Sequence, residues 1–351
     1  MANSNPTSFQ CKIKNLDTLL RVLVDGKNTD IKHNEKDCEG VTLASIEENK
    51  LIIHVAENVT VSKPIQIVSA IQTDQPLKLT QYFKIALEKN ASLTLLHCDD
   101  SLQKEHTDIQ NFVEISLAEN AHLNYYKMEN KSTGSVLTNQ IQVNQQAFSH
   151  FYSNVITFNA GKVSNFLHVH LNEPFADTQL NGLYLVDKQQ VIRNEVKVWH
   201  HAPDCTSRQL YKGIVDDEAC ATFNGHITVQ KDAQRTAASQ TNKNIALTDE
   251  AHIHTQPFLE IYADDVKCSH GATVGQLDEN ALFYLRTRGI CQKNARMLLM
   301  FAFANEVAQT VKIQALSERL SQMIQQRLKG ELHICSQCAL HCDQNREISF
   351  E

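Results

Sequence analysis

One short pattern recurs along this chain and limits its possible folds more than any other feature. The segment 87–93 reads LEKNASL, the segment 117–123 reads LAENAHL 30 residues later, and 143–148 (VNQQAF) is a weaker copy. A repeat in this range of lengths is typical of stacked units, each of which buries its apolar face against its neighbours. The repeat therefore predicts a β-solenoid in which Asn90 and Asn120 occupy equivalent corners of successive coils.

Composition favours the same architecture. The chain of 351 residues contains 27 Asn but 11 Gly. Sandwiches and hairpin barrels normally need more Gly for their tight turns. Asn adopts left-handed backbone conformations and can bond the backbone of a turn through its side chain. Strand-like segments of five to eight residues, such as 51–55 and 112–117, follow one another from about residue 41 to residue 265. We therefore expect a mainly β protein.

The sequence pattern divides the chain into four segments. Residues 1–45 are expected to be a short, partly helical N-terminal segment, because four leucines between residues 16 and 23 have helical spacing. Residues 46–275 form the expected β core. Residues 276–330 form a C-terminal helical domain, and residues 331–351 form a tail that contains Cys and His.

The helical domain is predicted from three amphipathic segments. Asp278 is a suitable N-cap for a helix over 279–288, and Gly289 is a suitable residue to end it. A second helix and a third follow, with apolar residues at helical spacing, and the third ends at Gly330.

The second helix carries more apolar residues than one buried stripe requires. Leu298, Leu299 and Phe303 are assigned to the core stripe, whereas Met297, Met300 and Phe301 lie off it. We expect these last three residues to form a second apolar surface that a partner covers.

Charge and motifs exclude several classes of function. The net charge of −7 argues against nucleic acid as a ligand, because phosphate binding needs a basic surface. The longest apolar run, 297–304, is too short to span a membrane, and the first residues do not resemble a secretory signal, so a cytoplasmic protein is expected. The sequence lacks the phosphate-binding and nucleophile motifs of nucleotide hydrolases, dinucleotide enzymes and serine hydrolases. We therefore expect no enzymatic activity.

Two groups of possible metal ligands lie outside the most informative motif. His168 and His170 are two residues apart in a strand, and Glu173 follows in the next turn, as in a cupin-like or solenoid metalloenzyme. The alternative is that they are ordinary polar residues on a strand face. The tail offers a second group of metal ligands or, alternatively, a solvated terminus prone to oxidation: Cys335, Cys338, His341 and Cys342.

Cys268 and His270 form the third candidate pair. They are two residues apart in an extended segment, so the thiolate and the imidazole can share one face. Such a soft and a borderline ligand suit iron or zinc, and Lys267 could lower the pKa of the thiol.

The residues around this pair resemble a known family. The stretch 262–275, YADDVKCSHGATVG, is similar to the SufB/SufD family of iron–sulfur cluster assembly proteins, and to its SufD branch most closely. Four further segments support the resemblance: 202–213 (APDCTSRQLYKG), 223–225 (FNG), 285–289 (LRTRG) and 302–304 (AFA).

The resemblance implies a fold, partners and roles for residues. The fold is a right-handed parallel β-helix with a C-terminal helical domain. The partners are a SufB homologue, which pairs with the β-helix, and the ATPase SufC, which binds the helices over 278–330. His270 and Cys268 then lie at the interface where a transient cluster assembles, and the isolated chain, possibly a homodimer, holds no stable cofactor. The function expected is that of a scaffold subunit.

Overall fold

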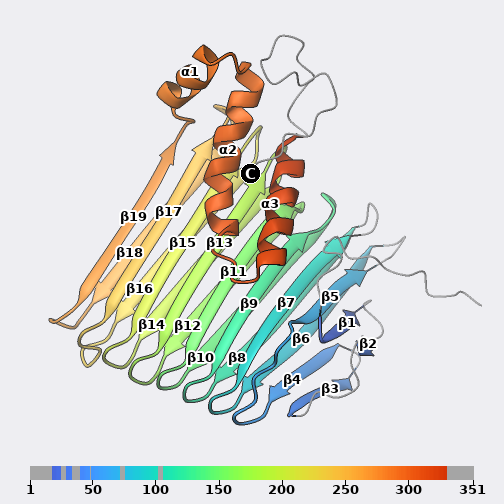
Figure 1. Ribbon diagram of the computed structural model, residues 1–351, viewed down its shortest axis with the longest axis vertical. Coiled ribbons are helices and arrows are strands. Elements are labelled where there is room, and N and C mark those ends of the chain that lie inside the picture. The colour runs from blue at the N-terminus through green and yellow to red at the C-terminus, as the bar shows by residue number, and fades with distance from the viewer. Residues whose placement is uncertain are drawn as a thin grey trace, which may run out of the picture.

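The computed structural model describes residues 18–24, 29–33, 40–47, 49–71, 76–101 and 106–329. It is a mainly β protein, a β-solenoid of about 7 turns followed by three helices, which confirms the predicted fold class (Figure 1). From β4 to β19, each coil contributes one strand to each of two facing sheets, and neighbouring strands of a sheet are parallel.

The two sheets are described by their strand order. The first runs β19-β17-β15-β13-β11-β9-β7-β5-β1-β2 and the second β18-β16-β14-β12-β10-β8-β6-β4-β3. The strands are β1 (Leu20–Val24), β2 (Thr29–His33), β3 (Val41–Glu47), β4 (Lys50–Val55), β5 (Ile65–Ile71), β6 (Leu77–Leu87), β7 (Ser92–Ser101), β8 (Thr107–Leu117), β9 (His122–Asn130), β10 (Val136–Gln145), β11 (His150–Asn159), β12 (Lys162–Leu171), β13 (Asp177–Val186), β14 (Val191–His200), β15 (Thr206–Val215), β16 (Cys220–Val229), β17 (Ala237–Ala246), β18 (His252–Ile261) and β19 (Lys267–Gly275).

Apolar side chains at alternate positions build the core between the sheets. In β12, Leu167, Val169 and Leu171 are buried, whereas the residues between them are partly exposed. The register places Val143 and Val198 beside Val169 on the neighbouring strands, so that apolar columns run along the solenoid. Each such buried side chain stabilises the fold by about 1.5–3 kcal/mol.

The corner asparagines behave as the repeat predicts. Asn58, Asn90 and Asn120 all have positive φ, at 63°, 58° and 56°. Nδ2 of Asn90 donates to Oδ1 of Asn58 at 2.7 Å, and Nδ2 of Asn120 donates to Oδ1 of Asn90 at 2.8 Å. The equivalence of Asn90 and Asn120 is confirmed, and the side-chain ladder explains why Asn is preferred to Gly at these corners.

In the third copy of the repeat, the sequence pattern places the corner at Gln146, two residues before its position in the structure. Gln145, not Val143, pairs with Leu117, so the corner position falls on Phe148. Phe148 has a φ of 58°, and its ring stacks on that of Phe175, which has a φ of 62°, at a centroid distance of 4.9 Å. The corner geometry persists along the solenoid although the residue at the corner changes.

The N-terminal segment differs from the expectation. Leu20–Val24 forms the strand β1 rather than part of a helix, and it pairs in parallel with β5. The leucine spacing wrongly indicated a helix, because strand pairing with a distant segment decides the structure here: Val22 pairs with Ile67. The β structure therefore begins before residue 46; Leu16 lies outside the described residues.

Three helices follow the last strand: α1 (Glu279–Thr287), α2 (Gln292–Ala308) and α3 (Gln314–Lys329). The Asp278 side chain accepts hydrogen bonds from two backbone N–H groups of α1, and Gly289 has a φ of 86°, which confirms both ends of this helix. In the described part of the chain, no helix is long and apolar enough to cross a membrane.

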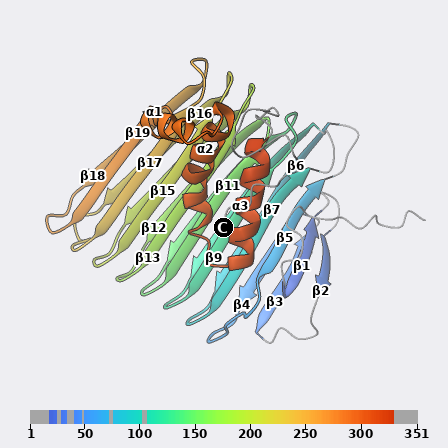
Figure 2. The same cartoon turned by 45° about the horizontal axis from the view of Figure 1, so that its top comes forward.

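The helices α2 and α3 lie on the outer face of the first sheet, across β9 to β15 (Figures 1 and 2). Tyr152 donates from its hydroxyl to the carbonyl oxygen of Thr310 at 2.7 Å. Arg327 Nη1 lies 2.8 Å from Oδ2 of Asp187. Lys212, almost fully buried, pairs with Glu306. The helices are therefore attached to several coils.

This packing corrects the predicted docking surface of α2. Met297 and Met300 are 1% and 2% exposed and belong to the core between α2 and the sheet. Leu298 and Leu299, which were assigned to the core, are half-buried, as is Phe301. The interpretation of Met297 and Met300 as an exposed surface is wrong, because the face that docks on the sheet is the opposite one.

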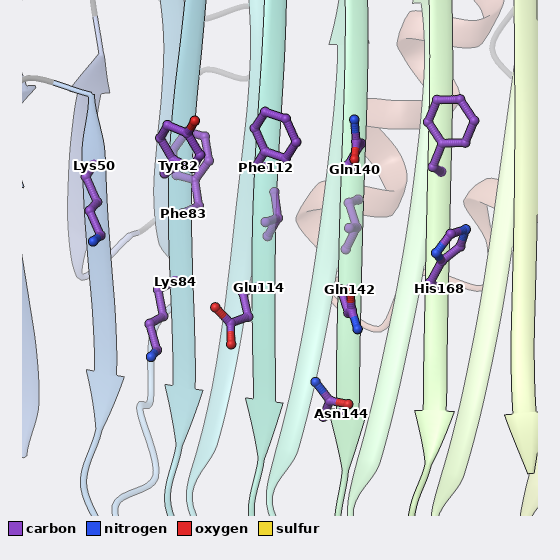
Figure 3. Close-up of a pocket in the computed structure, with 13 residues that line it drawn as sticks. Lys50, Tyr82, Phe83, Lys84, Phe112, Glu114, Gln140, Gln142, Asn144 and His168 are labelled. Carbon is purple, nitrogen blue, oxygen red and sulfur yellow. The ribbon is translucent and has the colours of Figure 1, made fainter. Parts of the chain in front are cut away.

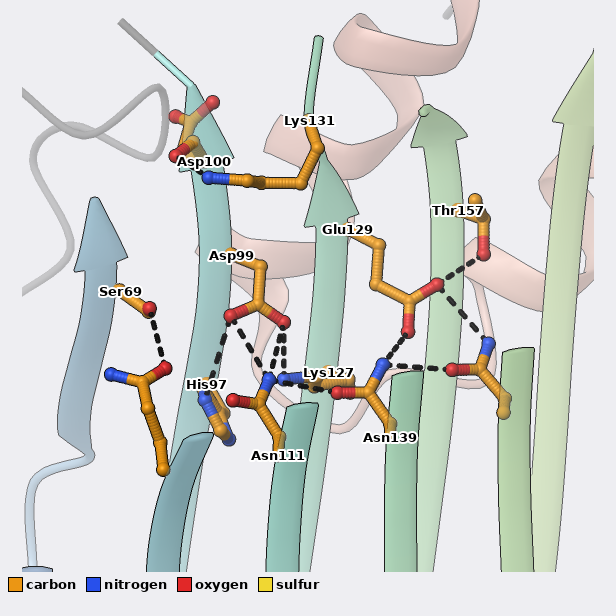
Figure 4. Close-up of polar contacts among 12 residues, drawn as sticks. Ser69, His97, Asp99, Asp100, Asn111, Lys127, Glu129, Lys131, Asn139 and Thr157 are labelled. Carbon is orange, nitrogen blue, oxygen red and sulfur yellow. Dashed lines mark hydrogen bonds and ion pairs between the residues drawn. The ribbon is translucent and has the colours of Figure 1, made fainter. Parts of the chain in front are cut away.

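Charged side chains also lie inside the solenoid (Figure 4). Lys127 Nζ lies 2.5 Å from Oδ2 of Asp99, and both side chains are buried. Glu129 accepts hydrogen bonds from Asn139 at 2.8 Å and from Thr157 at 2.5 Å. Burial raises the pKa of Glu129 to about 7, although Lys127 opposes this shift. Burial also disfavours ionisation of Asp99, but the charge of Lys127 holds the pKa of this carboxyl below its usual value.

Candidate functional site

The last coil forms an open end of the solenoid. The strands β18 and β19 close the strand orders of the two sheets at this end, and no strand among the described residues pairs with their outer edges (Figure 1). The opposite end differs, because it finishes in the short antiparallel strands β2 and β3. A free edge of parallel strand presents unpaired N–H and C=O groups, to which another chain can add.

Cys268 and His270 lie on the inner face of β19, at this open end. Their register partners on β17 are the buried residues Ala238 and Gln240, so the two side chains share one face. Cys268 is half-buried and packs against the core below it, whereas His270 is exposed. The two ligand-type side chains therefore lie on the last strand of the first sheet, at the open end.

The thiol of Cys268 is not activated in the way expected. Burial raises its pKa, although a hydrogen bond with the Ala238 backbone opposes this shift. Lys267 is exposed and neighbours Cys268 in a strand, where successive side chains point to opposite faces. The prediction that Lys267 lowers the thiol pKa is therefore wrong.

Large apolar side chains surround the open end. More than half of the exposed large hydrophobic residues that the structure describes belong to β18, to β19 and the connection between them, or to α1. Tyr262 is 63% exposed and Phe283 is 69% exposed. These residues are spread along the open end, and we refer to them together as the apolar patch; exposed apolar residues concentrated at one end of a molecule favour a binding surface there. The members of the apolar patch are Phe258, Ile261, Tyr262, Val274, Phe283 and Tyr284.

Sequence reasoning missed this apolar patch. Pro257, in the middle of β18, is the signal that could have located the edge. Proline has no N–H group to donate to a neighbouring strand, so within sheets it is confined largely to edge strands. It distinguishes β18 from the earlier described strands, which contain no proline.

The alternative ligand set on β12 is not assembled. His168 Nε2 lies 3.4 Å from Glu195 Oε1, and His170 Nδ1 lies 3.1 Å from Nε2 of His201. Glu173 instead accepts a hydrogen bond from the backbone N–H of Ala147 at 3.0 Å. Among the described residues, no three His, Cys, Asp or Glu side chains are placed to share a metal ion.

His168 borders a groove of about 690 Å³ on the outer face of the second sheet (Figure 3). Tyr82 and Phe112 stack there at a centroid distance of 5.3 Å, beside Glu114 and Gln142. The groove offers stacking and hydrogen-bonding groups but no assembled ligand set. The four predicted ligands of the tail, from Cys335 to Cys342, lie outside the described residues.

Comparison with known proteins assigns the chain to a family. Residues 70–303 match the family model described as SUF system FeS cluster assembly, SufBD core domain. The chain belongs to the SufBD family. The match includes β19 with Cys268 and His270, and it confirms the resemblance found from the motif around these residues.

Individual SufBD relatives agree with this assignment. The iron–sulfur cluster assembly protein SufD of Escherichia coli is 34% identical over 249 residues, which cover 67% of this chain and 58% of the relative. The SufBD family protein slr0076 of Synechocystis is 30% identical over 282 residues, which cover 78% of this chain and 62% of the relative. The chain thus spans about three fifths of the length of these two relatives. Iron–sulfur cluster assembly by the SUF system is the function that the description of the family names.

Proposed function

We propose that this SufBD chain is a non-enzymatic scaffold subunit that pairs with a SufB homologue through its open end and holds a transient iron–sulfur cluster as cargo. The observation that carries the proposal is the coincidence, in the last coil, of free strand edges, an apolar patch and the pair Cys268 and His270. A cytoplasmic location fits a scaffold of this kind.

Pairing at the open end follows from the physics of a solenoid. A partner strand satisfies the free N–H and C=O groups of the edge, and the partner's apolar residues cover Phe258 and Tyr262. The same contact excludes water from the inner face of β19. Two stacked solenoids therefore enclose Cys268 and His270 at their junction.

The two ligands suit a cargo rather than a resident cluster. One thiolate and one imidazole are fewer than the four ligands that hold a typical [2Fe–2S] or [4Fe–4S] cluster. The partner supplies the others, so separation of the chains releases the cargo. Because burial raises the pKa of the Cys268 thiol, metal binding must displace its proton.

The helices provide a separate surface for an ATPase of the SufC type. With Met297 and Met300 buried, this surface consists of the outward sides of α2 and α3, where Ala302, Glu318 and Gln322 are exposed. Because α2 and α3 are attached to several coils, movement of the ATPase would be transmitted to the solenoid. This coupling gives a chain with no nucleotide motif of its own a way to respond to ATP hydrolysis.

Replacing His270 with alanine should leave the fold and the pairing intact but lower the amount of cluster formed by at least tenfold. His270 is exposed, so its truncation removes a ligand without opening a cavity in the core. Cluster formation is measured by visible absorbance and iron content after anaerobic reconstitution of the complex with SufB and SufC homologues. His252→Ala, at an exposed histidine of the neighbouring edge strand β18, is the matched control. Equal cluster yields from His270→Ala and wild type would remove His270 from the site.

Replacing Tyr262 with aspartate should abolish co-purification with the SufB homologue. The carboxylate would have to lose its hydration where the partner covers the apolar patch, and it gains no partner charge there. Tyr82→Asp, at a 50% exposed tyrosine of β6 far from the open end, is the control. If the isolated chain is a homodimer through the same end, Tyr262→Asp should also convert it to a monomer in light scattering. Unchanged capture of the SufB homologue by Tyr262→Asp would place the pairing surface elsewhere.

A further inference from the structure

We propose that Gln240 is a positioning residue for His270, whose imidazole it orients by accepting a hydrogen bond at Oε1. The inference rests on the ligand role proposed for His270. Gln240 lies one coil before the open end. A hydrogen bond to it would fix the orientation of the exposed His270 side chain before a partner binds.

The register places these residues in one column on the inner face of the first sheet. Gln209 on β15 pairs with Gln240 on β17, and Gln240 pairs with His270 on β19. Gln209 and Gln240 are 3% and 1% exposed, whereas His270 is exposed. A short stack of buried amides therefore ends directly beneath the imidazole.

The amide of Gln240 has a defined direction along this column. Its Nε2 donates to Oε1 of Gln209 at 2.8 Å, on the side of the preceding coil. The oxygen of the same planar amide is consequently turned towards the following coil, where His270 stands. Oε1 of Gln240 is buried, and no described residue donates a hydrogen bond to it. A buried acceptor without a donor is unfavourable, and a hydrogen bond from His270 would offset this cost.

Gly225, on the facing strand β16, holds the amide in place. A Cβ atom at this position would lie 1.7 Å from Nε2 of Gln240, so no other residue leaves room for the glutamine side chain. Glycine is therefore required at position 225 because the Gln240 amide packs against its backbone, and not because the chain turns there.

This arrangement assigns the two nitrogens of the His270 ring. The N–H that donates to Gln240 fixes the neutral tautomer and the plane of the ring, and the other nitrogen keeps its lone pair directed to the open end. Histidine ligands of metals characteristically donate their second N–H to a carbonyl or carboxylate in this way, and loss of that acceptor typically costs 10–100-fold in metal affinity or activity.

The test compares Gln240→Met, which keeps the volume but removes the acceptor, with Gln240→Glu, which keeps an acceptor, and with His270→Ala. In the complex with SufB and SufC homologues, we expect Gln240→Met to lower cluster formation about tenfold and Gln240→Glu to restore most of it. In the full chain labelled with ¹⁵N-histidine, His270 should show one neutral tautomer, and in Gln240→Met a mixture. Gln145→Met, at a buried glutamine bonded to Ser149 and remote from β19, is the matched control and should resemble wild type.

Each outcome decides one point. Loss of cluster in His270→Ala but not in Gln240→Met would overturn the positioning role and leave the proposed function standing. No loss in either variant would refute the ligand role of His270 itself. An unchanged tautomer in Gln240→Met would also overturn the inference, whatever the cluster yield. Gly225→Ala, which displaces the amide without altering Gln240, should reproduce the tautomer mixture, and a wild-type spectrum would contradict the proposed geometry.

Discussion

Replacing Lys127 with methionine should lower the free energy of unfolding by about 3–5 kcal/mol at neutral pH. Lys127 and Asp99 form an ion pair inside the solenoid, with both side chains at most 1% exposed. Removal of the ammonium group leaves the Asp99 carboxylate buried without its counter-charge, and Glu129 also loses a stabilising charge. Urea denaturation followed by circular dichroism measures the change.

The loss from Lys127→Met should depend on pH in a defined direction. Without the lysine, the pKa of Asp99 in the folded protein rises above that of the unfolded chain. A carboxyl group with a raised pKa destabilises the fold increasingly as the pH rises above its unfolded value. The deficit should therefore be larger at pH 8 than at pH 5. Lys89→Met, which removes a surface pair with Glu119, is the control and should change stability little. Equal effects at Lys89 and Lys127 would contradict the role assigned to burial.

Acid should unfold the protein through two buried histidines. Burial lowers the pKa of His97 to about 3, with the charge of Lys127 adding to the shift. Burial likewise lowers the pKa of His200 to about 3. Below pH 6.5 the unfolded chain binds a proton at each of these two histidines, whereas in the folded chain both histidines stay neutral. The stability that neutral histidines provide is therefore present above pH 6.5 and is lost as the pH falls towards 3.

Glu129 opposes this trend over part of the range. Its folded pKa of about 7 lies above the unfolded value, so between pH 7 and 4.5 the folded chain holds a proton that the unfolded chain releases. Below pH 6.5, where the unfolded chain also protonates the two histidines, we expect a net slope of about one proton, or about 1.4 kcal/mol per pH unit. Glu129→Gln should steepen the slope to about two protons, and His97→Gln should flatten it. The measurement is the free energy of unfolding at pH 5, 6 and 7, and identical slopes in the three proteins would contradict the assignment.

The parts of the fold that sequence reasoning predicted depend on short-range signals. Asn90 and Asn120 were recognisable because the residues that build a corner lie within one heptapeptide. Asp278 and Gly289 were recognisable because a helix cap involves the next few residues. The placement of Cys268 and His270 on one face was predictable for the same reason, since strand geometry alone places residues two apart on one face.

The parts that were missed depend on partners far along the chain. Val22 lies in a strand because Ile67 is beside it, and the local leucine spacing carries no trace of this pairing. The apolar residues of α2 surround most of the helix, so the sheet beneath it decides that Met297 and Met300 are buried. Lys127 on β9 meets Asp99 on β7, the neighbouring strand one coil earlier, at a separation in sequence that no motif describes.

The left-handed corner residue has a further consequence for the length of the molecule. A residue with positive φ stands at the same corner from Asn58 to Arg235, although Asn, Phe, Asp and Arg all occupy the position. Each coil therefore begins and ends in the same way, and it adds about 4.8 Å, the spacing of paired strands. Gain or loss of a whole coil would therefore change the distance between the two ends of the solenoid in steps of fixed length. The residues at each end would stay the same.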